Sequence, residues 1–123
     1  METDTTVKSA FVYMVECEDA SIYTGITKDI RHRMKEHFLK TGRGAKYTKS
    51  RPVKSIRMVW EVESYSLAAK MEYAIKQLPR SKKLRLIEAP EGGIKENFPQ
   101  LATEQVIVRR EYIGSIAALL KVL

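Results

Sequence analysis

The sequence predicts an α+β domain, in which a small three-stranded antiparallel sheet is flanked by helices. Two segments, 11–16 and 22–27, alternate apolar and polar residues as strands do, and the polar residues 18–21 between them suit a hairpin turn. A third alternating segment, 55–62, is expected to complete the sheet. Segments with the 3.6-residue apolar period of helices follow the second and third strands.

The two hairpin strands are expected to be half-buried and to carry tyrosines on one face. Because side chains alternate along a strand, Tyr13 shares a face with Phe11 and Val15, and Tyr23 shares a face with Gly25. Gly25 has no side chain that would block the approach of a ligand. The pattern therefore predicts tyrosines next to a bare position.

The first helix is expected to begin at a cap formed by Thr27 or Asp29 and to end near residue 39 or 40. Arg33 and His37 lie one turn apart along one edge of its apolar stripe, where a side chain can be held by packing and still reach a cleft. On spacing alone, a solvated arginine and a packed histidine are the simpler interpretation. The stripe consists of Ile30, Met34 and Phe38, and the far side of the helix carries His32 and Glu36.

The positive charge is concentrated in one segment of the chain, residues 28–57. Residues 28–57 contain eleven lysines and arginines against two acidic residues, whereas the whole chain has a net charge of +7. A second basic cluster lies at 80–85. This concentration favours a polyanionic partner, and nucleic acid is the commonest one for a basic domain.

The centre of the basic segment is a glycine-rich loop, 41–52. It lacks the GK[ST] ending and the preceding hydrophobic strand of a phosphate-binding P-loop. Lysines, arginines and a tyrosine in such a loop suit contacts with the phosphate backbone and stacking on a base or sugar. The residues expected to bind nucleic acid here are Lys46, Tyr47, Lys49 and Arg51.

A second amphipathic helix is expected to begin at Ser64 or Ser66 and to end before Pro79. Glu72 lies at the edge of its apolar face. The simpler interpretation of Glu72 is a helix-surface ion pair with Lys76, four residues later. Residues 81–89 are expected to form a short basic helix or turn.

The C-terminal third is expected to be an extension of a domain that spans residues 1–89. Residues 90–99 resemble a linker because of their prolines and glycines. Residues 103–123 are apolar and are expected to form a helix, although 106–108 would also suit a strand. This apolar tail is expected to pack on the domain, on a second copy or on a protein partner.

The composition points to an intracellular protein. The single cysteine, Cys17, excludes an intrachain disulfide and a cysteine-based zinc cluster. The polar start of the chain is unlike a signal peptide, and no stretch approaches the roughly 20 apolar residues of a membrane span. We expect a cytoplasmic location, or a nuclear one in a eukaryotic or viral setting, and no membrane partner.

Several of these residues, in this order, resemble the GIY-YIG nuclease superfamily, and most closely its small stand-alone branch, which is related to excision-repair and structure-selective repair nucleases. The resemblance runs from about residue 11 to residue 87. The first motif reads Val12-Tyr13-Met14 in place of Gly-Ile-Tyr, and Thr24 replaces the isoleucine of the second. The matching elements are Val12-Tyr13, Tyr23-Thr24-Gly25, Arg33 with His37, Ala45–Thr48 and Glu72.

The resemblance implies hydrolysis of a nucleic-acid phosphodiester with one divalent metal ion, Mg²⁺ or Mn²⁺. Glu72 would be its sole protein ligand, with water and phosphate oxygens completing the coordination. Arg33 would bind the phosphate through its fork of donors. Without a second matched carboxylate, a two-metal site is not expected.

The same resemblance implies roles for the tyrosines and the histidine. Tyr13 is the candidate general base, with His37 as proton acceptor or orienting group, or as the base itself. A phenol with a pKa near 10 needs a nearby cation to act at neutral pH. Tyr23 would support the site, Gly25 would let the substrate backbone approach, and Lys46 and Tyr47 would contact nucleic acid.

The predicted function is therefore a metal-dependent endonuclease acting on DNA, with RNA left open, in DNA repair or processing. It is expected to be structure-selective or weakly sequence-specific, because no added reader such as a zinc finger is present. The alternative is a nucleic-acid-binding module with the same fold and negligible catalysis. A third possibility is a scaffold that docks through its tail.

Overall fold

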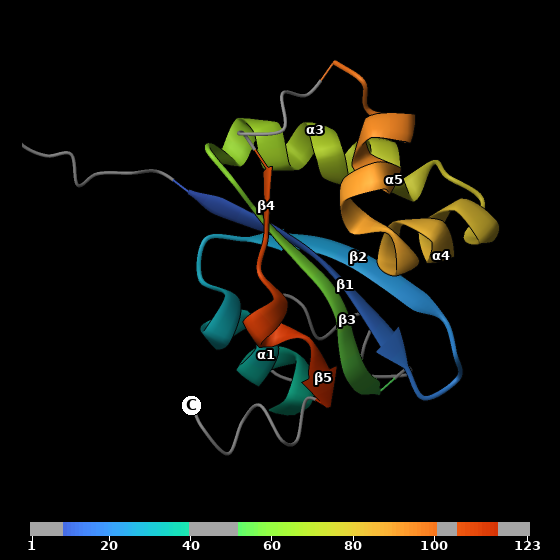
Figure 1. Ribbon diagram of the computed structural model, residues 1–123. Helices are drawn as coiled ribbons and strands as arrows, with labels where there is room; N and C mark the ends of the chain where they lie inside the picture. Colours follow the sequence, from blue (N-terminus) through green and yellow to red (C-terminus); the bar gives the residue numbers. More distant parts are fainter. Residues whose placement is uncertain (1–8, 40–51, 101–105, 116–123) are drawn as a thin grey trace, which may run out of the picture.

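The computed structural model describes residues 9–39, 52–100 and 106–115, with the backbone alone at 38 and 39. The strands are β1 (Ala10–Cys17), β2 (Ile22–Thr27), β3 (Val53–Val62), β4 (Val106–Val108) and β5 (Gly114–Ser115) (Figure 1). The helices are α1 (Ile30–Leu39), α3 (Tyr65–Lys76), α4 (Arg80–Glu88), α5 (Pro90–Asn97) and the short 3-10 helix η2 (Arg110–Tyr112). The predicted α+β class is confirmed.

The sheet is antiparallel, with the strand order β2-β1-β3-β4 and with β5 also paired to β3. The three predicted strands form its centre, and β4 and β5 extend it. The hairpin register places Tyr13 opposite Gly25. The expectation that the first strand is half-buried was wrong, because β1 lies between β2 and β3 with helices over both faces.

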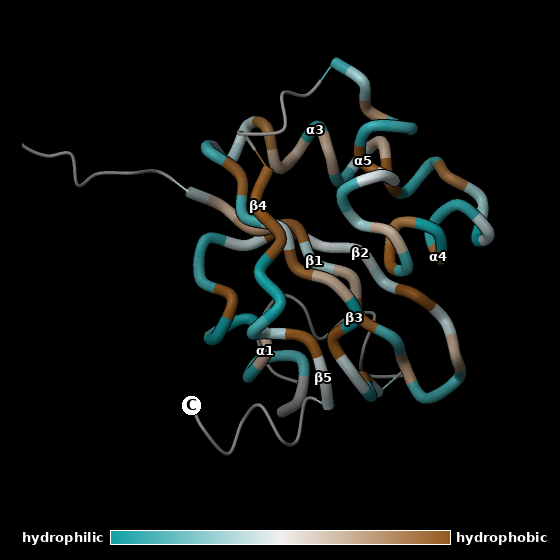
Figure 2. Tube along the Cα trace, viewed as in Figure 1, coloured by the Kyte–Doolittle hydropathy of each residue, from teal (hydrophilic) through white to brown (hydrophobic). Residues whose placement is uncertain are grey.

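Each face of the sheet has its own hydrophobic core, and Figure 2 shows that hydrophobic stretches run along the strands in the middle of the molecule. One face packs against α3, α4 and α5 through a cluster that includes Val12, Met14, Met58, Trp60, Ala68, Met71, Ile75, Leu86, Ile94 and Phe98. The other face packs against α1 through Tyr13, Val15, Cys17, Ile30, Met34, Val53, Ile56 and Val59, with Tyr112 of η2 beside them. The candidate site belongs to this second face.

Local polar groups begin the two helices that carry candidate site residues, as predicted. Asp29 caps α1, because the backbone N–H of His32 donates to its carboxylate at 3.1 Å, and the Thr27 hydroxyl accepts from the N–H of Asp29 at 3.1 Å. Ser64 caps α3 by accepting from the N–H of Leu67 at 3.0 Å. The positions of α1 and α3 are therefore set by signals within the sequence.

The expectation of a linker at 90–99 was wrong, because α5 occupies most of this segment. Pro90 is the first helical residue, where its missing N–H removes no helical hydrogen bond. Gly93 lies where α5 crosses α4, since a Cβ there would be 2.8 Å from a Leu86 methyl group. The glycine at position 93 therefore allows α4 and α5 to pack closely and does not mark a loop.

The predicted helix over 103–123 is also wrong in its described part, 106–115, which forms β4, η2 and β5. The β-branched run at 106–108 pairs with Trp60 to Val62 of β3. Arg109 then forms ion pairs with Glu61 on β3 and with Glu111. This part of the tail packs on the domain itself, one of the predicted alternatives. In the described ranges, no helix is long and apolar enough to cross a bilayer.

Candidate active site

Four of the predicted catalytic residues meet on the α1 side of the sheet. The Tyr13 hydroxyl and His37 Nε2 are 2.8 Å apart, and Arg33 Nε donates to the same hydroxyl at 3.1 Å. The Tyr23 ring centroid lies 6.3 Å from that of Tyr13 and 5.6 Å from that of His37. Strands β1 and β2 supply the tyrosines, and α1 supplies the other two side chains.

The hydrogen bonds give the Tyr13 proton a path to His37. A phenol hydroxyl has one proton, and the Tyr13 oxygen already accepts from Arg33. With a neutral imidazole that carries its proton on Nδ1, the Tyr13 hydroxyl donates its own proton to His37 Nε2. The site is a chain of hydrogen bonds that runs from Arg33 through Tyr13 to His37.

Burial sets the protonation states of this chain. Tyr13 and His37 are 0% and 1% exposed. Burial, and then the charge of Arg33, lower the pKa of His37 to about 4. Burial raises the pKa of Tyr13 above its ordinary value, and the charges of Tyr23 and Glu72 add to this, although Arg33 opposes it. At neutral pH the pair is therefore a neutral phenol and a neutral imidazole.

Glu36 contacts Arg33 and was missed by the sequence analysis, which placed it on the far side of the helix. The Glu36 carboxylate accepts from Arg33 Nη1 at 3.2 Å and lies 3.4 Å from His32 Nε2. The three-residue spacing between Arg33 and Glu36 is the signal that would have indicated this pair. Glu36 holds the guanidinium from one side while Tyr13 binds it from the other.

Glu72 lies on α3 and is linked to the site through Lys76. Its carboxylate lies 3.4 Å from Lys76 Nζ, so the predicted ion pair is present. Lys76 Nζ in turn lies 5.8 Å from the Tyr23 ring centroid. The charge of Glu72 is also near enough to contribute to the raised pKa of Tyr13. Glu72 can therefore form the ion pair with Lys76 and also act at the site.

A metal ion would have to depend mainly on oxygen atoms from outside the protein. Among the described residues, no group of three or more histidine, cysteine, aspartate or glutamate side chains could hold an ion. Glu72 is a half-buried carboxylate with an exposed part, and its ion-pair partner Lys76 lies over the Tyr23 ring of the site. A single carboxylate completed by water and phosphate suits Mg²⁺ or Mn²⁺, so this donor set fits the expected ion.

Gly25 has a different function from the one predicted. Tyr13 faces it across the hairpin, and a Cβ at position 25 would be only 2.5 Å from Cζ of the Tyr13 ring. The bare position is therefore filled by the Tyr13 ring and is itself buried. Gly25 gives Tyr13 the space to lie over β2 and reach His37.

Replacing Gly25 by alanine is expected to destabilise the fold by about 1–3 kcal/mol, because the new methyl group forces the Tyr13 ring to move. Urea unfolding measures this loss. Gly92→Ala in α5 is the matched control, since nothing lies within 4 Å of a Cβ there. If Gly25→Ala costs as much in a Tyr13→Ala background as in the wild type, the ring is not the cause.

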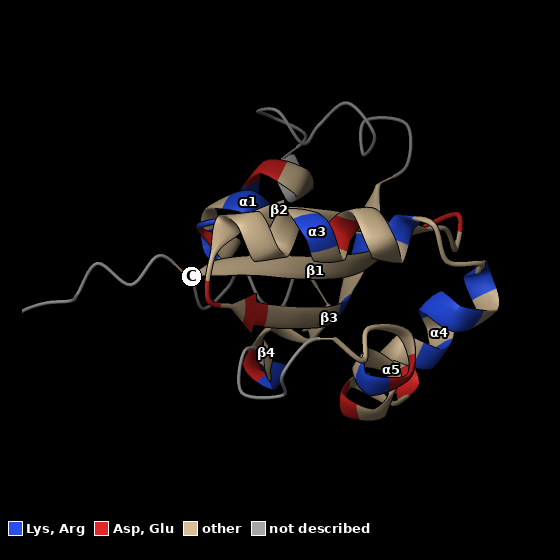
Figure 3. Ribbon diagram, turned by 90° about the horizontal axis from the view of Figure 1, so that it is seen from above, with Lys and Arg blue, Asp and Glu red and all other residues tan. Residues whose placement is uncertain are grey.

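The predicted nucleic-acid-binding residues of the loop lie outside the described residues. These are Lys46, Tyr47, Lys49 and Arg51. Their roles stay predictions. Elsewhere, Figure 3 shows lysines and arginines on α1, α3 and α4.

Comparisons with known proteins point to one family. Residues 9–85 match the GIY-YIG catalytic domain. The chain is 43% identical over 86 residues to a UPF0213 protein of Fusobacterium nucleatum, covering 70% of this chain and 84% of the relative. It is 48% identical over 82 residues to a UPF0213 protein of Staphylococcus aureus, covering 65% of this chain and 95% of the relative.

A solved structure is also similar. The solution NMR structure of a UPF0213 protein from Bacillus halodurans is 40% identical, with a TM-score of 0.44, and the match covers 76% of this chain and 97% of that one. The family match runs from β1 into α4 and so includes each candidate catalytic residue. The chain therefore belongs to the GIY-YIG family of nuclease domains, as its resemblance predicted.

Proposed function

We propose that the chain is a metal-dependent endonuclease that hydrolyses phosphodiester bonds in DNA. The observation that carries this proposal is the hydrogen-bond chain from Arg33 through Tyr13 to His37, with Glu72 beside it. It combines a cation for a phosphate, a route for a proton and a carboxylate for a metal ion.

Arg33 binds the phosphate and stabilises the negative charge that develops on it. Its side chain is partly exposed, and the guanidinium offers several donors in a fixed plane. Tyr13 and Glu36 hold that plane on two sides, so little reorganisation is needed when charge develops. The phosphate competes with Glu36 for Nη1.

Tyr13 and His37 take the proton of the attacking water. The water oxygen bonds to phosphorus while its proton passes to the Tyr13 oxygen and the Tyr13 proton passes to His37 Nε2. The bond between phosphorus and the leaving oxygen breaks, and that oxygen takes a proton from solvent. A phosphate at Arg33 offsets the charge that helps to lower the pKa of His37, which makes the imidazole a better acceptor.

Glu72 would hold the metal ion, either Mg²⁺ or Mn²⁺. When bound, the ion supplies positive charge that offsets the charge on the phosphate and on the leaving oxygen. Lys76, which pairs with Glu72, is a long surface side chain that can move aside for the ion.

The proposed substrate is DNA with a nick, flap or branch, in repair or processing, and RNA is left open. The basic residues on α1, α3 and α4 offer phosphate contacts of the kind that carry no sequence information. The relatives are bacterial, which suits a cytoplasmic setting where chromosomal DNA is present. A second copy or a protein partner on the C-terminal tail stays a prediction.

Glu72→Gln is expected to lower metal-dependent cleavage by at least about a hundredfold while DNA binding persists, because the ion loses its carboxylate ligand. The assay uses labelled single-stranded, duplex, nicked, flap and branched DNA with Mg²⁺ or Mn²⁺. Glu88→Gln, on the exposed surface of α4, is the control and should cut like the wild type. Cleavage that survives Glu72→Gln would come from a contaminant or from another site.

One observation favours the second candidate, a DNA-binding module with negligible catalysis. Tyr13 is fully buried and its pKa is raised, so a water molecule reaches its oxygen only after neighbouring side chains move. Binding of every DNA form without cleavage in either metal would support this candidate.

A further inference from the structure

The outward face of α3 carries two exposed tyrosines beside Glu72. Tyr65 is 45% exposed and Tyr73 is 69% exposed. Tyr65 precedes Glu72 by about two helical turns and lies on the same line of the helix, whereas Tyr73 follows Glu72 directly and points further out. The buried face of α3 is formed by Ala68, Met71 and Ile75. Neither tyrosine is therefore part of the buried face of α3.

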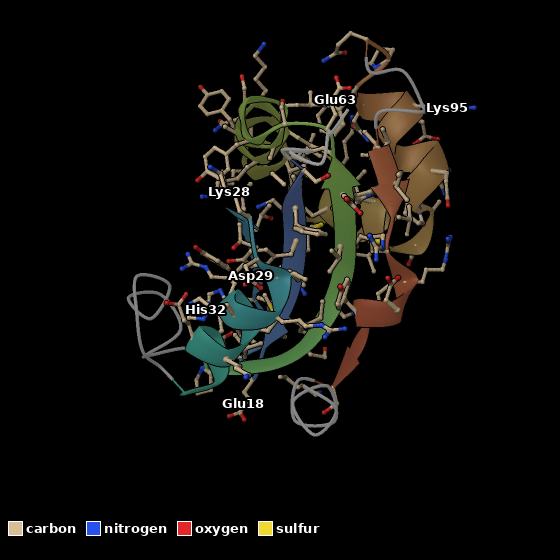
Figure 4. The ribbon with its side chains drawn as sticks, turned by 90° about the vertical axis from the view of Figure 1, so that its left-hand side faces the viewer. Glu18, Lys28, Asp29, His32, Glu63 and Lys95 are labelled. Carbon is tan, nitrogen blue, oxygen red and sulfur yellow. The ribbon has the colours of Figure 1, made fainter. Side chains whose placement is uncertain are left out.

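A cation from another element lies over the first of these rings. Lys28 belongs to the connection between β2 and α1, and its Nζ lies 5.3 Å from the Tyr65 ring centroid. Figure 4 shows Lys28 between α3 and α1. Lys76 lies over Tyr23 in the same way at 5.8 Å. Two lysine–ring pairs, Lys28 with Tyr65 and Lys76 with Tyr23, thus lie on the side of α3 that holds Glu72.

Exposed rings and cations of this kind fit unpaired nucleobases. Every base has a flat face that can stack on an aromatic side chain, and lysines beside the rings contact the phosphates that link the bases. In a duplex the bases are stacked on one another and present only their edges in the grooves. A stacking surface therefore selects strands whose bases are unpaired.

We propose that Tyr65 and Tyr73 stack unpaired nucleobases and hold a single-stranded segment along α3 next to Glu72. The proposal rests on the proposed function, because it places this segment beside the reacting phosphate. Lys28 contacts the backbone of the same segment. The two tyrosines then make the enzyme prefer sites with unpaired bases over continuous duplex.

The test is binding of the full chain to two fluorescent probes without Mg²⁺ or Mn²⁺, so that no cleavage occurs. One probe is a short oligothymidylate, and the other is a blunt-ended duplex of two separate strands with the same total number of phosphates and no loop. Tyr65→Ala and Tyr73→Ala are each expected to weaken oligothymidylate binding roughly tenfold. Each phenylalanine variant should stay within about twofold of the wild type, because the ring remains. Duplex binding should stay within about twofold in all four variants.

The salt dependence separates stacking from charge. The tyrosine variants should leave the slope of log affinity against log salt unchanged, whereas Lys28→Ala should reduce it by about 0.7 for the single strand. Ile107→Ala, which removes an exposed apolar side chain from β4, is the control and should change neither probe.

The outcomes distinguish this inference from the proposed function. Equal losses on both probes, or no loss on either, would overturn the stacking role even if cleavage still depends on Glu72. If the phenylalanine variants lose more than about twofold in oligothymidylate binding, the hydroxyl groups cause the effect, and the stacking role is overturned. A wild-type chain that binds neither probe overturns the proposed function together with this inference.

Discussion

Arg33→Ala is expected to reduce metal-dependent DNA cleavage by about a hundred- to a thousandfold, because a preorganised donor at the phosphate is lost. Arg33 Nε binds the Tyr13 hydroxyl, so the variant also frees the phenol from its cationic partner. Arg33→Lys keeps the positive charge but loses the planar fork of donors. Its cleavage rate should therefore fall between those of the wild type and Arg33→Ala. Single-turnover cleavage at saturating enzyme measures the chemical step apart from binding.

The matched control for this prediction is Arg57→Ala. Arg57 is also a partly buried arginine in an ion pair, with Glu16, but it lies on β3 outside the hydrogen-bond chain of the site. The Arg57→Ala variant should lose some folding stability and little cleavage activity. If Arg33→Ala cuts DNA as fast as Arg57→Ala, Arg33 is a structural arginine and the proposed mechanism is wrong.

Acid is expected to destabilise the fold through His37. Its pKa is about 4 in the folded chain and about 6.5 when exposed, so the unfolded chain binds the extra proton between these values. The contribution of His37 is complete above about pH 6.5 and is lost as the pH falls towards 4. The loss amounts to about 3 kcal/mol, and urea unfolding at pH 7 and at pH 4 measures it.

Two histidine variants isolate this effect. His37→Gln should lower stability at pH 7, because the bond with Tyr13 changes, but should flatten the pH dependence. His32→Gln serves as the control, since the side chain of His32 is 68% exposed, and it should keep the wild-type pH dependence. An unchanged slope in His37→Gln would show that other groups cause the acid sensitivity.

Signals within a few residues made much of the site predictable. The four-residue spacing placed Arg33 and His37 along one edge of α1, and Asp29 and Ser64 marked the starts of the helices that hold the site. The resemblance to the family then predicted that Tyr13 belongs to the same site. Each of these inferences depends on helix geometry or on a known motif, and none of them requires knowledge of the tertiary packing.

The misses depend on contacts between distant segments. Gly25 looks like an opening for a ligand until the register shows that the Tyr13 ring fills the space. Gly93 looks like a linker residue until α4 and α5 are seen to pack together. The sequence of residues 106–108 suits a helix or a strand equally. These residues form a strand because they can pair with the edge of β3.

The pairing of β4 and β5 with β3 protects an edge of the sheet. Unpaired N–H and C=O groups along an edge strand are a template for strands of other molecules and so for aggregation. The segment that matches the family ends at residue 85, before these two strands begin. A chain shortened to that segment would expose the ten-residue strand β3 to such pairing. Strands β4 and β5 therefore guard the domain against self-association along β3.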